Sequence, residues 1–222
     1  MGRHGYDASM KNLPALALAA LLVGSLSPLL AQDSGWVNLF DGKTLDGWTA
    51  EKGGPPVGWI VKDGCIYRSE KGGNLHSLGT YLNFELEFEW KVDKGVNSGL
   101  KYRYSGGVGP EYQVIDDVNG NEAKPKGQAA ALYALKAAEG KQVNPYGEWN
   151  SARIVARGNH LEHWLNGKKV VEIEIGSEEW NQLKAESKFK NKADFGTLAG
   201  PIHLQDHGGA AYFRNLRIKK LD

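Results

Sequence analysis

Cysteine and excess charge are both scarce in this chain. Its 222 residues include a single cysteine, Cys65, which excludes an intrachain disulfide framework and any multi-cysteine zinc or iron–sulfur site. The 27 basic and 26 acidic residues leave a formal charge of +1. Because no basic field exists to hold a polyanion, nucleic acid is not an expected partner.

Short motifs for cofactors and metals are also absent. The sequence contains no Gly-x-Ser-x-Gly elbow, phosphate loop, dinucleotide fingerprint, HExxH or EF-hand pattern. His203 and His207 would lie on one face of a strand but roughly 13 Å apart, and His160 and His163 on opposite faces. We therefore expect no cofactor and no metal, since a metal would need residues brought together from separate loops.

No apolar run is long enough for a comfortable membrane span. The apolar stretch at residues 13–23 follows Met10 and Lys11 and leads into small residues ending near Ala31, which is the layout of a secretory signal. We expect residues 1–31 to hold upstream residues and a signal peptide, and residues 32–222 to form one domain. The mature protein is then expected to be periplasmic or secreted and not membrane-spanning; its oligomeric state stays open.

Glycine and strand-forming residues are plentiful. The 29 glycines separate short segments rich in Val, Ile, Phe, Tyr and Trp. At residues 84–92 apolar and charged residues alternate strictly, which is typical of a half-buried strand, and the Asn-Gly turn at 166–167 is a hairpin signal. These patterns predict an all-β, two-sheet antiparallel jelly-roll sandwich, with minor helical insertions at residues 128–138 and 177–187.

In three segments, residues 97–104, 109–117 and 200–208, apolar residues alternate with polar residues that are unusual for a plain solvent-exposed face. If they neighbour one another in one sheet, alternation gathers five polar side chains on its outer face: Arg103, Glu111, Gln113, His203 and Gln205. Sugar hydroxyls need donors and acceptors in fixed positions, which such groups supply on rigid strands. The expected partner is an oligosaccharide or glycoside.

Each of these residues also has a structural interpretation. Arg103 and Glu111 can form a cross-strand ion pair, and His203 can be a hydrogen-bonded structural histidine. His207, beside a glycine turn, suits a general acid or base, whereas Asp117 can belong to a turn.

The row Glu85, Glu87 and Glu89 resembles the spaced acids of β-sandwich glucanases. The alternative is an exposed charged face that resists edge aggregation.

Several segments taken together resemble one family, the 3-keto-disaccharide hydrolase domain, formerly the domain of unknown function 1080. The similarity runs from about Trp36 to Leu221 and is carried by residues 38–48, 97–103, 109–113, 200–208 and 213–217. The resemblance implies a concanavalin A-like fold and cleavage of glycosides oxidised at C3. A departure lies at residues 117–150, a long segment expected to form a loop over the groove.

The resemblance also implies a chemistry. A 3-keto group acidifies the C2 proton, so that a base removes it, an acid assists departure from C1, and water then adds. On matching positions Glu111 or Asp117 would be the base, His207 the acid, and Arg103 or Gln113 the group that holds the ketone. The other expected functions are a noncatalytic carbohydrate-binding module and a conventional β-glucanase.

Overall fold

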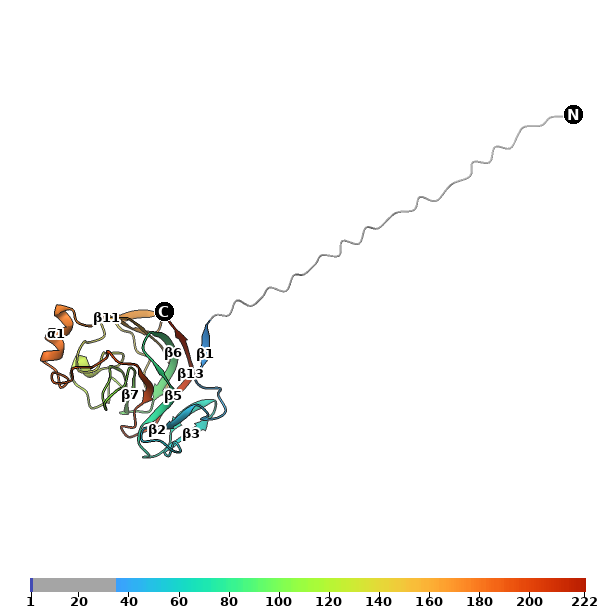
Figure 1. Ribbon diagram of the computed structural model, residues 1–222. Helices are drawn as coiled ribbons and strands as arrows, with labels where there is room; N and C mark the ends of the chain where they lie inside the picture. Colours follow the sequence, from blue (N-terminus) through green and yellow to red (C-terminus); the bar gives the residue numbers. More distant parts are fainter. Residues whose placement is uncertain (2–34) are drawn as a thin grey trace. The chain divides into compact units, whose positions relative to one another are not determined.

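The alternating segment at residues 84–92 forms the central strand of a large sheet. The computed structural model describes Met1 and residues 35–222, so the predicted signal segment lies, apart from Met1, outside the described residues. Strand β6 (Phe84–Val92) alternates buried apolar residues with partly exposed charged ones, as predicted. Residues 35–222 lie within one compact unit (Figure 1).

The larger sheet has eight antiparallel strands in the order β11-β10-β9-β6-β13-β4-β3, with β1 paired to β13. Its strands are β1 (Trp36–Asn38), β3 (Trp59–Lys62), β4 (Cys65–Arg68), β6, β9 (Asn150–Arg157), β10 (His160–Leu165), β11 (Lys168–Glu174) and β13 (Ala211–Lys220). Asn166 and Gly167 adopt φ values of 47° and 81°, the positive values that a type I′ turn requires between β10 and β11. The predicted hairpin is confirmed.

The smaller sheet has five antiparallel strands in the order β2-β5-β12-β7-β8. They are β2 (Trp48–Ala50), β5 (Leu75–Tyr81), β7 (Asn97–Lys101), β8 (Glu111–Ile115) and β12 (Gly200–Leu204). The three segments that the sequence singled out therefore supply adjacent strands β12, β7 and β8, as the hypothesis of a shared face required.

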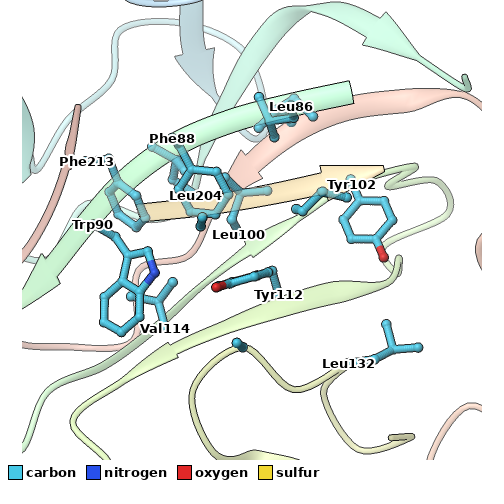
Figure 2. Close-up of a cluster of buried hydrophobic side chains, with 14 of the residues drawn as sticks. Leu86, Phe88, Trp90, Leu100, Tyr102, Tyr112, Val114, Leu132, Leu204 and Phe213 are labelled. Carbon is cyan, nitrogen blue, oxygen red and sulfur yellow. The ribbon is translucent and has the colours of Figure 1, made fainter. Parts of the chain in front are cut away.

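The hydrophobic core lies between the two sheets (Figure 2). Phe88 of β6 meets Tyr112 of β8 edge to face, with ring centroids 5.3 Å apart. Leu100, Leu204 and Phe213 are likewise fully buried. Because these residues occupy one face of each strand, the alternating positions of the smaller sheet point away from the core.

Helix is a minor component, as predicted, but not at both expected places. Helix α1 (Glu178–Ala185) is capped at its N-terminus by Ser177, whose hydroxyl accepts from the Trp180 N–H, and a 3-10 turn, η1, spans Pro125–Gly127. The helix expected at residues 128–138 is wrong. Its backbone instead bonds along the edge of β8, where Gln113 N donates to Ala131 O and Ala130 N to Gln113 O. In residues 35–222 no helix is long and apolar enough to cross a membrane.

Candidate active site

A row of polar side chains crosses the outer face of the smaller sheet. His203 of β12 lies opposite His76 of β5 on one side and Lys101 of β7 on the other, and Lys101 lies opposite Glu111 of β8. Cross-strand partners share a face of the sheet, so the four side chains form one line. We call these four residues the polar row.

Glu111 is the most unusual member of the polar row, because it is an acid with only 4% of its surface exposed. The Lys101 ammonium lies 3.8 Å from its Oε2 atom, whereas Oε1 accepts no hydrogen bond from the described residues. Burial raises the pKa of the Glu111 carboxyl to about 7, against the opposing effect of Lys101 and Lys188. A carboxyl with these properties can accept and return a proton near neutral pH.

A glycine makes room for this carboxylate. Gly99 of β7 faces the Glu111 side chain, and a Cβ atom at Gly99 would overlap Oε1. The carboxylate therefore lies directly over the backbone of β7.

Amide side chains continue the face beyond Glu111. The Gln113 side chain is buried and donates from Nε2 to Asn97 Oδ1 at 3.3 Å, while its Oε1 atom accepts nothing from the described chain. Gln205 follows β12, and its backbone N–H donates to Gly99 O at 2.9 Å. Gln113 and Gln205 thus both neighbour Gly99, over which the Glu111 carboxylate lies, and their amides can bind hydroxyl groups.

The two histidines of the polar row contact each other. His76 Nε2 and His203 Nδ1 are 2.7 Å apart, and the Tyr104 ring packs against both imidazoles. Burial lowers the pKa of His76 and lowers that of His203 to about 2. Both rings are therefore neutral at pH 7, and His203, expected in the sequence as a sugar contact, is fully buried on this face.

Arg103 does not lie on this face, and the prediction that placed it beside Glu111 is wrong. Its side chain is buried and donates to the carbonyls of Leu82 at 2.7 Å, Gly158 at 2.9 Å and Gly196 at 2.9 Å. The backbone at Arg103 has a φ of 46°, which ends the alternation of β7 and redirects the side chain. Lys101, not Arg103, is the cross-strand partner of Glu111.

Asp117 and His207 lie outside the polar row. The Asp117 carboxylate accepts from Ala129 N at 2.7 Å and from Lys141 Nζ at 2.6 Å. These two bonds stabilise the loop after β8. His207 is exposed and follows Asp206, whose carboxylate is bonded to Arg68 and to the backbone N–H groups of Gly72 and Gly73. Their catalytic roles stay predictions.

Sequence reasoning missed two members of the face. His76 lies in a segment with no clear alternation, so only the pairing of β5 with β12 brings it to His203. Lys188 comes from the segment after α1, and its ammonium lies 4.2 Å from the centre of the Tyr133 ring. Burial lowers the pKa of Lys188, while Glu111 opposes that shift. No sequence pattern marks Lys188, because the fold alone brings it near Glu111.

The larger sheet presents a different outer face. Glu85, Glu87 and Glu89 of β6 each pair with an arginine, namely Arg153, Arg217 and Arg214. Because β6 is a central strand, the edge-protection interpretation of this row does not apply. A carboxylate that already holds an arginine is less available as a nucleophile or acid, which disfavours the glucanase hypothesis.

A two-sheet antiparallel sandwich that presents a buried carboxylate, amides and lysines on one outer face has the character of a carbohydrate-active β-sandwich protein. Residues 35–219 match the family model of the 3-keto-alpha-glucoside-1,2-lyase-like domain, and the chain belongs to this family. The predicted family and fold class are confirmed.

Similar proteins agree with this assignment. The chain is 34% identical to the 3-keto-disaccharide hydrolase of Bacteroides thetaiotaomicron, over 85% of this chain and 79% of that protein. It is 36% identical to a crystal structure from Parabacteroides distasonis described as "a putative glycosyl hydrolase", with a TM-score of 0.77 over 85% of this chain and 94% of that one. A second such structure from that organism is 30% identical, with a TM-score of 0.65 over 84% and 99% of the two chains. These relatives support a carbohydrate hydrolase, the class of enzyme that the sequence predicted.

Proposed function

We propose that the protein cleaves the glycosidic bond of 3-keto glycosides and disaccharides by elimination followed by hydration. The observation that carries this proposal is the buried Glu111 carboxyl. One of its oxygens accepts no hydrogen bond from the residues that the structure describes, and burial raises its pKa to about 7. The name of the Bacteroides relative, 3-keto-disaccharide hydrolase, supports the choice of substrate.

Glu111 is the proposed base. In a 3-keto sugar the carbonyl acidifies the C2 proton, and the carboxylate removes it to give an enolate. The enolate then expels the C1 substituent as the C1=C2 bond forms, and the departing oxygen takes a proton. Addition of water across this bond gives the free 3-keto sugar, so that the net reaction is hydrolysis.

The neighbours of Glu111 supply the remaining roles. Lys101 and Lys188 act on Glu111 electrostatically, and their ammonium groups are the proposed donors to the enolate oxygen. The amides of Gln113 and Gln205 are the proposed partners of sugar hydroxyl groups. His207, exposed beyond the end of β12, is the proposed acid for the departing oxygen. The layout of residues 1–31 supports export to the periplasm or beyond.

Product release tests this proposal. We would measure cleavage of 3-keto-trehalose, 3-keto-sucrose and simple 3-keto-glucosides, each beside its unoxidised parent. We expect only the oxidised sugars to be cleaved, and Glu111→Gln to reduce the rate at least 100-fold. Glu87→Gln, on the opposite sheet, is the matched control and should retain the rate. Sugar binding without turnover would favour a carbohydrate-binding module, and cleavage of unoxidised β-glucans that Glu87→Gln abolishes would favour a glucanase.

A further inference from the structure

Glu111 and Gln113 each hold one buried oxygen atom that has no donor. The two residues are about 7 Å apart along β8 and share its outer face. Gln113 is 1% exposed, and neither Glu111 Oε1 nor Gln113 Oε1 accepts a hydrogen bond from the part of the chain that the structure describes. A buried acceptor without a donor is unfavourable, so two of them on one face indicate a common partner from outside the chain.

The Gln113 amide is oriented by its neighbours. Its Nε2 atom donates to Asn97 Oδ1 at 3.3 Å, and Asn97 Nδ2 donates in turn to Asn121 Oδ1 at 3.0 Å. This chain of amides uses the nitrogen end of the Gln113 side chain and leaves its oxygen end to accept from another group.

Gly99 brings the free oxygens of both residues to the same part of the sheet. It is the cross-strand partner of Gln113 on β7, and a Cβ atom at Gly99 would overlap Glu111 Oε1. The Glu111 side chain therefore extends along the face toward Gln113, into the position that a side chain at Gly99 would occupy. One small molecule between the two side chains can contact both oxygens.

Two neighbouring acceptors restrict the chemistry of their partner. A ketone or an anion has no hydrogen to donate, and a sugar hydroxyl has one, which satisfies only one of the two oxygens. A water molecule has two hydrogens and can donate to both. Buried waters in proteins typically bind polar groups that are otherwise unsatisfied, so the pair of oxygens favours water as its partner.

We propose that Glu111 and Gln113 bind the water molecule that adds to the substrate in the hydration half of the reaction. The inference rests on the proposed function, and it identifies the hydroxyl partner of the Gln113 amide as water. Glu111 can hold this water after it has taken the C2 proton, because a protonated carboxyl still accepts through its other oxygen.

The direction of the strands suits this step. Strands β8 and β12 both run antiparallel to β7, so that Gln113 and His207, which follows β12, lie on the same side of the polar row. A sugar that places C2 at Glu111 and its ketone at Lys101 can direct C1 to that side. The water is then next to the carbon that it attacks.

Addition of this water restores both proposed acid–base groups. The water oxygen forms a bond to C1, the electrons of the C1=C2 bond pass to C2, and C2 takes back the proton that Glu111 holds. One proton of the water passes to His207, which has given its own proton to the departing oxygen. One water is thereby added across the double bond, and the product is the free 3-keto sugar.

Separate assays of the two halves test the role of Gln113. Release of 4-nitrophenolate from 4-nitrophenyl 3-keto-glucoside reports elimination. NMR distinguishes the 1,2-unsaturated 3-keto intermediate from 3-keto-glucose, and the purified intermediate is also supplied alone. Gln113→Met keeps the length of the side chain but loses its strong acceptor. We expect this variant to release 4-nitrophenolate within about threefold of the unaltered rate and to hydrate the intermediate at least tenfold more slowly, so that the intermediate accumulates.

Two further variants complete the design. Gln113→Asn withdraws the amide by one carbon and should show the same accumulation. Gln205→Met is the matched control, because it removes an amide from the same face without touching either free oxygen. It should raise KM for the glycoside without accumulation of the intermediate. Thermal unfolding shows which variants remain folded.

The outcomes separate this inference from the proposed function. Equal hydration of the supplied intermediate by folded Gln113→Met and the unaltered chain overturns the inference, even if 3-keto glycosides are cleaved. A loss of both halves together, or a shift in the pH dependence of 4-nitrophenolate release, would show that Gln113 acts on Glu111 directly and also overturns it. Failure of the unaltered chain to release 4-nitrophenolate would instead count against the proposed function, and hydration of the supplied intermediate would still decide the role of Gln113.

Discussion

Glu111 is the proposed base because its carboxyl is buried away from water. The positive charges of Lys101 and Lys188 favour its ionised form, yet burial outweighs them and raises the pKa to about 7. A buried group whose pKa lies near the working pH is characteristic of acid–base sites. Gly99 completes the arrangement, since any side chain there would displace the carboxylate.

The rate of cleavage should therefore depend on Glu111 ionisation. We expect kcat/KM to rise with pH through about 7, because the base must be deprotonated. Lys101 lowers the pKa of Glu111, so that Lys101→Met should move this rise to higher pH. Exposed Lys43→Met is the control and should leave it in place. An identical pH profile in Lys101→Met and the unaltered chain would count against Glu111 as the titrating base.

Ionisation of Glu111 should also lower the free energy of unfolding. Its folded pKa of about 7 lies above the ordinary value of 4.5, so its contribution to stability is fully present below pH 4.5 and is lost as pH rises through 7. This difference corresponds to about 3 kcal/mol. We expect the free energy of unfolding of Glu111→Gln to exceed that of the unaltered chain by up to that amount at pH 8, and to differ little from it at pH 4. Denaturant unfolding at the two pH values measures both differences. A less stable variant at pH 8 would contradict this prediction.

At the scale of elements, two basic residues near the end of β7 have different roles, one in the candidate site and one in the stability of the fold. Lys101, the last residue of the strand, faces Glu111, whereas Arg103, two residues later, turns inward and joins three loops through their carbonyls. Simple alternation would place both on one face. The left-handed backbone at Arg103 is a local event that alternation does not detect.

Arg103 should therefore matter for stability. Lysine cannot reproduce the planar fork of donors, so Arg103→Lys would leave buried carbonyls without partners. We expect a loss of about 2–4 kcal/mol in the free energy of unfolding, measured with urea. Arg153→Lys, in a partly exposed ion pair with Glu85, should change it by less than about 1 kcal/mol. Unchanged stability with weakened sugar binding in Arg103→Lys would restore the role expected from the sequence.

At the scale of the whole molecule, the two sheets have outer faces of different character. The glutamates of β6 are neutralised by arginines across the larger sheet. The smaller sheet instead holds one oxygen atom each of Glu111 and Gln113 and one ring nitrogen of His203 that have no hydrogen-bond partner among residues 35–222. Buried polar atoms without partners are costly. Among the described residues, three of the four such side-chain atoms lie on this face, and the fourth is Trp90 Nε1 in the core.

Much of this architecture follows from the sequence. Strict alternation in β6 and the Asn-Gly turn predicted strands and a hairpin, and the segments around Glu111, Gln113 and His203 were expected to share one sheet. The alanine-rich segment was predicted as a helix because local propensity favours one, but its backbone pairs with the edge of β8 instead. His76 and Lys188 reach the face through long-range packing, which single-sequence periodicity does not contain.

Exchange of the C2 proton is the most direct test of the central claim that Glu111 is the base. We would incubate 3-keto-glucose with the protein in deuterium oxide and follow the C2 and C4 protons by NMR. The account predicts rapid loss of the C2 signal with the unaltered chain, exchange at C4 no faster than in buffer, and exchange at C2 reduced to the buffer rate with folded Glu111→Gln. Equally rapid C2 exchange with Glu111→Gln would contradict it and assign the base to another residue.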